Sequence, residues 1–257
     1  MDYNYHAHTT RCGHATGTPE EYIETAIAGG IQYMGFSDHA PFRFPDGYES
    51  YFRVPMAEAE EYISQMRQLR EKYRGKIELS VGFEMEYYPA HFTAMLATAR
   101  NFGAEYLILG QHFLGNERPN GFHTQDLTDQ TEYVREYVTT VIEGMKTGVF
   151  TYVAHPDIFK YNGDMKVYAD EMRKICVASR DLGIPLEINF LGIRRGRNYP
   201  NAVFWELAGK EQCPVTFGFD AHETESACDR RSQKIAEELV EKYSLNYIGR
   251  PKLISIA

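Results

Sequence analysis

Short apolar runs alternate with amphipathic stretches along the whole chain. The apolar runs predict strands at Tyr3–His6, Tyr33–Ser37, Ile77–Glu84, Tyr106–Leu109, Tyr152–Ala154, Leu186–Asn189 and Val215–Phe219, with a further candidate at Tyr247–Ile248. The amphipathic stretches predict helices at Pro19–Gly29, Met56–Tyr73, Ala90–Phe102, Asp129–Met145, Tyr168–Leu182, Ala202–Gly209 and Arg230–Tyr243. Regular alternation indicates a parallel sheet, because parallel neighbours need crossover connections. Seven or eight such units favour closure into an α/β barrel over an open sheet.

Capping residues support these boundaries. Thr18 stands before Pro19, a pair typical of a helix start. Glycine follows several of the predicted helices, as a helix C-terminus often requires. No linker, repeat or low-complexity tract interrupts the pattern, so we expect a single domain over residues 1–257.

The composition fits one α/β barrel of 257 residues. Its 36 acidic residues against 27 basic ones give a formal charge of −9, which argues against nucleic acid as a partner, since such a surface needs a basic face. The chain shows no basic leader and no run of about 20 apolar residues. Its four cysteines form no C-x-x-C pair, which fits reduced thiols. We therefore expect a cytoplasmic protein that does not span a membrane.

Nine residues with metal-binding side chains fall at or just beyond the ends of predicted strands. They are His6, His8, His14, His39, Glu84, His112, His155, Asp220 and His222. Histidine supplies neutral nitrogen ligands, and carboxylates supply anionic oxygens that bridge cations. Parallel α/β barrels carry their chemistry on the loops that follow the strands. The shared placement predicts one multinuclear metal site at one end of the barrel.

The nine candidate ligands together are stronger evidence for a metal site than any one of them alone. The two-residue spacing of His6 and His8 turns both side chains to one face of an extended segment, and the spacing recurs at Asp220–His222. Taken alone, each histidine is compatible with a backbone contact or a surface position. Glu84 ends an apolar strand, where a carboxylate requires cations. Glu86 is the alternative candidate for the bridging carboxylate. If Glu84 is the bridge, we expect Glu86 to contact substrate or to support a metal ligand.

Three other side chains have more than one interpretation. Cys12 lies within the first histidine cluster, either as a ligand or, as we favour, as a small residue packed beside the site. His91 and His123 have the surroundings of surface or loop residues. From the loop 115–124, His123 can still reach the mouth of the site.

The ordered set of nine residues resembles the polymerase and histidinol phosphatase (PHP) family over nearly the whole chain. The resemblance implies a distorted (β/α)7 barrel that holds three divalent ions of zinc, manganese or iron. By this analogy one ion takes His6, His8, Glu84 and Asp220. A second ion shares Glu84 and adds His112 and His155. The third takes His14, His39 and His222.

Chain length and the segment Glu187–Pro200 resemble stand-alone histidinol-phosphate phosphatases more than polymerase-attached domains. The implied substrate is small and phosphorylated: L-histidinol phosphate, an intermediate of histidine biosynthesis. The resemblance implies a small residue before His112, where this chain has Gln111. The difference leaves the ligands unchanged but affects which exact substrate is implied.

The expected reaction is hydrolysis of a phosphate monoester. Metal coordination lowers the pKa of water from 15.7 to about 7, so a hydroxide that bridges two ions can attack phosphorus in line. Glu84, Asp220 and His222 are the predicted catalytic residues. Either Asp220, transiently protonated, or the third ion would assist the leaving alkoxide.

Basic residues after the later strands would lie at the catalytic end and hold the phosphate. Arg194, Arg195 and Arg197 cluster after the sixth strand, and Lys160 follows the fifth. Arg197, Lys160 and Arg194 are the predicted phosphate-binding residues. A run of charges like this one can equally be a solvated loop.

Three other functions compete with this interpretation. A PHP-type phosphoesterase acting on nucleotides or another small phosphate ester would use the same metals. A metal-dependent amidohydrolase also begins with H-x-H, but typically shows a bridging lysine at a middle strand, where this chain has Glu84. A binding module with a dead site would have lost ligands, and none of the nine is missing. The sequence does not indicate an oligomeric state.

Overall fold

A computed structural model describes residues 1–256 of the chain. Its main sheet has eight parallel strands in the order β1, β2, β3, β4, β7, β8, β9, β10. Their bounds are Tyr3–Asn4, Tyr33–His39, Glu78–Met85, Tyr106–Leu109, Phe150–Val153, Leu186–Asn189, Pro214–Gly218 and Asn246–Tyr247. The sheet curls, and a single parallel bridge between Ala7 and Ala221 joins the segments that follow β1 and β9. The predicted distorted α/β barrel is therefore confirmed.

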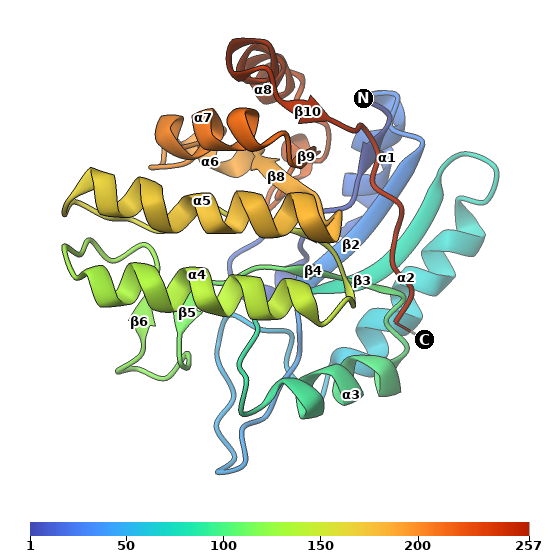
Figure 1. Ribbon diagram of the computed structural model, residues 1–257. Helices are drawn as coiled ribbons and strands as arrows, with labels where there is room; N and C mark the ends of the chain where they lie inside the picture. Colours follow the sequence, from blue (N-terminus) through green and yellow to red (C-terminus); the bar gives the residue numbers. More distant parts are fainter. Residues whose placement is uncertain (257) are drawn as a thin grey trace.

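Within residues 1–256, eight α-helices surround the sheet. Helices α4 and α5 lie side by side against it (Figure 1). Their bounds are α1 Pro19–Ala28, α2 Ala59–Lys72, α3 Phe92–Phe102, α4 Thr131–Lys146, α5 Met165–Leu182, α6 Phe190–Arg195, α7 Ala202–Glu211 and α8 Arg230–Tyr243. The helix start predicted at Thr18 is confirmed, since its side chain and that of Glu21 form a reciprocal capping box. Glycines with positive φ end α3 and α5 at Gly103 and Gly183.

Sequence reasoning missed two elements at the catalytic end. Helix α6 follows β8 directly and has Asn189 as its cap, whereas its arginines had suggested a loop. The expected loop 115–124 contains the turn and the second strand of an antiparallel hairpin, formed by β5 (Phe113–Leu114) and β6 (Phe122–His123). Two 3-10 helices, Thr10–Cys12 and Thr224–Cys228, complete the described elements. In residues 1–256 no helix is both long enough and apolar enough to pass through a bilayer.

Candidate metal centre

The barrel closure brings four of the predicted ligands together. Ala221 donates its N–H to the carbonyl of His6 at 3.1 Å, and His8 donates its N–H to the carbonyl of Ala221 at 2.9 Å. This parallel bridge aligns the two-residue motifs of the first and last core strands. The side chains that flank the paired alanines are those of His6, His8, Asp220 and His222.

Glu84 lies at the centre of the cluster and is 1% exposed. The parallel register of β2 and β3 sets it opposite His39. Its Oε2 lies 3.4 Å from His6 Nε2, 3.5 Å from His8 Nε2 and 3.4 Å from His39 Nδ1. Its Oε1 lies 2.8 Å from His155 Nε2 and 3.5 Å from His112 Nε2. One carboxylate thus faces two different sets of imidazoles, the arrangement expected of a bridging ligand.

A glycine makes room for this carboxylate. A Cβ atom at Gly110 would lie 1.9 Å from Glu84 Oε1, so no larger residue fits while Glu84 keeps its position. Gly218 does the same for Glu187, whose Oε1 would lie 1.6 Å from an added Cβ. The two close approaches show that both carboxylates occupy sites built around them.

All nine predicted ligands contribute to groups whose donor atoms lie within 4.8 Å of one another. The groups are His6 with His8 and Glu84; His6 with His155 and Asp220; His39 with Glu84 and His112; His14 with His39 and His222; and His8 with Cys12 and His222. Cys12 therefore borders the centre, and its buried thiol donates to the carbonyl of Thr9 at 3.1 Å.

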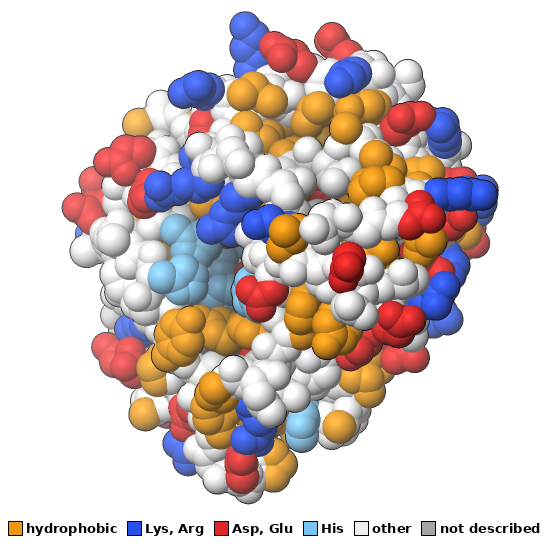
Figure 2. All heavy atoms as spheres, turned by 90° about the vertical axis from the view of Figure 1, so that its left-hand side faces the viewer, with side chains coloured by type: hydrophobic (Ala, Val, Ile, Leu, Met, Phe, Trp, Pro, Cys, Tyr) orange, Lys and Arg blue, Asp and Glu red, His pale blue; other side chains and the backbone are white. Residues whose placement is uncertain are grey.

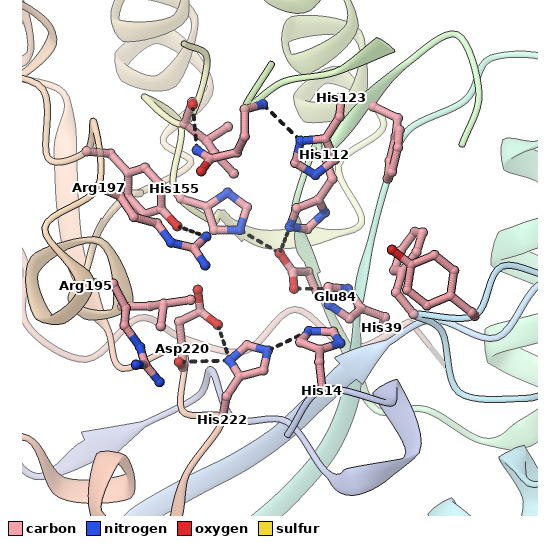
Figure 3. A pocket seen from close by; sticks show the side chains of 17 residues that line it. His14, His39, Glu84, His112, His123, His155, Arg195, Arg197, Asp220 and His222 are labelled. Atoms are coloured by element: carbon pink, nitrogen blue, oxygen red, sulfur yellow. Dashed lines mark hydrogen bonds and ion pairs between the residues drawn. The ribbon is translucent and has the colours of Figure 1, made fainter. Parts of the chain in front are cut away.

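His14 and His222 show the need for a cation most directly. The Nδ1 of His14 lies 2.7 Å from the carbonyl of Cys12, and that of His222 lies 3.2 Å from the carbonyl of Asp220. Because a carbonyl only accepts, both rings carry their proton on Nδ1 and a lone pair on Nε2. The two Nε2 atoms nevertheless face each other at 3.0 Å (Figure 3). A metal ion bound by both lone pairs fits this contact.

Two buried carboxylates hydrogen-bond to the Nδ1 atoms of histidines, and a third lies near another ring without such a bond. Glu187 lies 2.8 Å from His6 Nδ1, and Glu86 lies 2.8 Å from His112 Nδ1. Asp38 lies 3.5 Å from His8 Nδ1. Such partners fix the tautomer that leaves Nε2 free for a metal. Sequence reasoning missed Glu187 and Asp38, although both lie near strand ends; Glu86 has the supporting role offered as one of its two interpretations.

The buried charges do not balance. Six carboxylates with exposures of 4% or less lie beside the histidines or, in the case of Glu117, beside the Arg53 that pairs with Glu86: Asp38, Glu84, Glu86, Glu117, Glu187 and Asp220. The only buried guanidinium among residues 1–256 is that of Arg53, which pairs with Glu86 and Glu117. Five negative charges therefore have no fixed counter-charge. Burial of so many anions is too unfavourable to stand alone, so the donor set fits divalent cations.

The pKa of His6 reflects the same excess of negative charge, whereas those of His222 and Asp220 have other causes. Burial lowers the pKa of His6, but Glu187, Asp220 and Glu84 outweigh it and raise the value to about 10. At His222 burial dominates, and the pKa falls to about 4. Burial raises the pKa of Asp220, but His6, His222 and His8 hold it well below its usual range. Asp220 is therefore anionic, which suits a ligand better than a proton donor.

Two of the ligand positions have unusual backbone conformations. His155 and Asp220 have φ angles of 32° and 46°, a region that non-glycine residues seldom adopt. Such strain persists where the surrounding structure enforces it, and it gathers at functional sites. Both residues lie two positions beyond the end of a strand, β7 and β9 respectively.

The centre lies at the base of a pocket of about 460 Å³. Figure 2 shows the histidines in a hollow, with basic side chains on one lip and hydrophobic side chains on the other. Arg195 and Arg197 line the pocket, as do Phe52 and Phe113. A pocket of this size suits a small ligand.

The structure corrects two of the three predicted phosphate contacts. Arg194 donates to the carbonyls of Phe219 and Asp220, both at 2.9 Å, and does not line the pocket. Lys160 is exposed and lies outside the pocket lining as well. Helix α6 explains why Arg194 is absent from the lining, because successive helical residues point in different directions and, of its two arginines, Arg195 faces the pocket. Arg197, the remaining choice, lines the pocket.

The PHP domain family matches residues 4–190 of this chain. The match covers more than half of the sequence and includes Glu84 and six of the seven clustered histidines. The chain belongs to the PHP domain family, as the sequence had predicted.

Known relatives are similar over most of the chain. The probable histidinol-phosphatase of Deinococcus radiodurans is 27% identical over 226 residues, which cover 85% of each sequence. The histidinol-phosphatase of Bacillus subtilis is 25% identical over 255 residues, covering 85% of this chain and 92% of that protein. The crystal structure of histidinol phosphate phosphatase from Lactococcus lactis, complexed with zinc, L-histidinol and phosphate, has a TM-score of 0.73. At 19% identity it covers 99% of this chain and 97% of that one, and it shows the same fold.

Proposed function

We propose that this chain is a metal-dependent phosphomonoesterase that hydrolyses L-histidinol phosphate to L-histidinol and phosphate. The observation that carries the proposal is Glu84, which faces two sets of histidines at the base of a pocket with two arginines in its wall. A bridging carboxylate supports a two-metal hydrolytic centre. The identity of the alcohol rests on the relatives, which are named histidinol-phosphatases.

Three positions for divalent ions are proposed, with zinc, manganese or iron as candidates. His6, His8, Glu84 and Asp220 would hold the first, and Glu84, His112 and His155 the second. His14, His39 and His222 would hold the third. The His14, His39 and His222 group and the His6, His8 and Glu84 group support this division. His155 also groups with His6 and Asp220, and His39 with Glu84 and His112, which fits adjacent positions that share ligands.

Charge explains why the arginines matter. Three divalent ions would turn the buried excess of five negative charges into one positive charge, and a hydroxide would cancel it. A nearly neutral centre would not by itself attract a phosphate dianion strongly. Arg195 and Arg197 supply the remaining attraction.

Bound divalent ions would make hydroxide available near neutral pH and offset charge on the phosphate oxygens. Glu84 would hold two ions at a fixed separation, and the carboxylates bonded to Nδ1 of His6 and His112 would keep each Nε2 deprotonated. Arg197 donates to the hydroxyl of Tyr199 at 3.1 Å, which fixes the guanidinium for a phosphate oxygen. A cytoplasmic location and the absence of nucleic-acid partners remain predictions.

The test joins metal analysis with phosphate release. We expect at least two divalent ions per chain and faster phosphate release from L-histidinol phosphate than from nucleoside monophosphates or a phosphodiester. Glu84→Gln should lower kcat by a factor of at least about 100 and reduce the metal content. Glu61→Gln, at an exposed position on α2, is the matched control and should change neither. Fewer than two metals together with no phosphate release would refute the proposal.

A further inference from the structure

His123 has a place in the pocket that the metal centre does not explain. It contributes to none of the potential metal-binding groups among residues 1–256, yet it lines the pocket beside Phe113. The ring centroids of these two residues lie 4.7 Å apart in an edge-to-face contact. Figure 3 places His123 next to His112 and away from Arg195.

The hairpin fixes His123 relative to the metal centre. Strand β5 begins directly after His112, and β6 returns with His123 paired to Phe113. Thr124 then donates its N–H to the carbonyl of His112 at 2.8 Å. A shift of His123 would therefore require a shift of a predicted metal ligand.

Hydrogen bonding also fixes the tautomer of the His123 ring. The backbone N–H of Gln125 donates to His123 Nδ1 at 3.0 Å. Since Nδ1 is the acceptor, the proton of the ring lies on Nε2. A ring that accepts at Nδ1 is neutral, because the imidazolium form carries a proton on both nitrogens. No residue of the described chain accepts a hydrogen bond from Nε2.

We infer that His123 is a specificity-determining residue for the leaving alcohol, to which its Nε2–H donates a hydrogen bond; this inference rests on the proposed function. An imidazole ring has the required acceptor nitrogen when it is neutral. Phe52 and Phe113, stacked with centroids 5.5 Å apart, both line the pocket and offer apolar surface for such a ring. Arg195 and Arg197 are left for the phosphate end of the substrate.

The experiment compares two esters that differ in their side chain. L-leucinol phosphate has the amino alcohol and the phosphate of L-histidinol phosphate but an isobutyl group in place of the imidazolylmethyl group. His123→Phe keeps an aromatic ring of similar size and removes the donor. It should lower kcat/KM for L-histidinol phosphate about tenfold, mainly through KM, and leave L-leucinol phosphate unchanged. His123→Gln, which retains an N–H donor, should recover part of the loss.

Several results would overturn the inference. An equal fall for both esters would mean that His123 contacts the phosphate or supports the fold, and no fall would mean that it contacts neither end. Metal content at the wild-type level in both variants is part of the expected result; a loss of metal in His123→Phe would assign His123 to the support of His112. If the wild-type protein prefers L-leucinol phosphate or hydrolyses neither ester, the proposed function itself fails. The wild-type rates therefore separate that failure from failure of the inference.

Discussion

Glu187→Gln tests how the centre selects the tautomer of His6. Glu187 is fully buried, and three donors converge on its two oxygens. Oε1 lies 2.8 Å from His6 Nδ1, while Oε2 accepts from the N–H of His155 at 3.0 Å and from Asn189 Nδ2 at 2.8 Å. A glutamine fits the same volume but has one acceptor and one donor group in place of two acceptors. It cannot satisfy all three donors in either orientation.

The geometry predicts which orientation is adopted. If the amide NH2 faces the N–H of His155 and Nδ2 of Asn189, donor faces donor in both contacts. Each contact then costs about 1–3 kcal/mol, because a buried donor is left without an acceptor. If the NH2 faces His6, only one contact changes, and His6 adapts by moving its proton from Nδ1 to Nε2. The second orientation is favoured. The proton on Nε2 then blocks the nitrogen that faces Glu84 and the first metal position.

We therefore expect Glu187→Gln to fold and to weaken metal binding about 10- to 100-fold, with a parallel fall in kcat at limiting metal. Chelator competition measures the affinity, and elemental analysis after dialysis measures the stoichiometry. Glu211→Gln is a matched control, since Glu211 is also largely buried but pairs with Arg173 and Arg180 away from the site. Wild-type metal affinity in folded Glu187→Gln would refute the tautomer argument.

Three further changes test other parts of the centre. Arg53→Met leaves two buried glutamates without their cation and should lower the free energy of unfolding by about 3–5 kcal/mol, measured by urea denaturation; a change below 1 kcal/mol would contradict the pairing seen here. Gly110→Ala should displace the Glu84 carboxylate and reduce metal content. Gly148→Ala, where an added Cβ meets nothing within 4 Å, should lower stability because its φ is 70°, but it should leave the metal content of the folded protein unchanged; equal metal content in both variants would count against the close packing. Because the raised pKa of His6, about 10, means that a proton must leave before a metal binds, apparent metal affinity should rise up to tenfold per pH unit between pH 7 and pH 10. A flat profile in chelator competition over that range would argue against His6 as a ligand.

Much of the fold follows from local pattern. The seven core strands and seven of the helices lie close to the segments that hydrophobic periodicity predicts, because each buries one face against a common sheet. Helix α6 and the β5–β6 hairpin escaped prediction because each is too short to show a periodic pattern. Both depend on their tertiary neighbours: α6 starts on the Asn189 side chain, and the hairpin is tied to the metal-binding loop through Thr124.

The ligand set could be predicted, but its supporting residues could not. The sequence shows the type and spacing of the ligands at the ends of the strands. Because the carboxyl ends of parallel strands lie at one end of the barrel, residues at these positions are expected to lie close together. No such rule relates Glu187 to His6, 181 residues away, or Arg53 to Glu117. Those contacts depend on register and side-chain direction across the barrel.

The sequence by itself determined which residues can bind metal and at which end of the barrel they gather. Only the tertiary structure decided which nitrogen of each histidine faces the centre, how many buried charges need compensation, and which basic residues reach the pocket. The physical reason is that hydrophobic periodicity reports burial one residue at a time. Tautomers, charge balance and pocket lining instead depend on atoms from distant strands that meet within hydrogen-bonding distance.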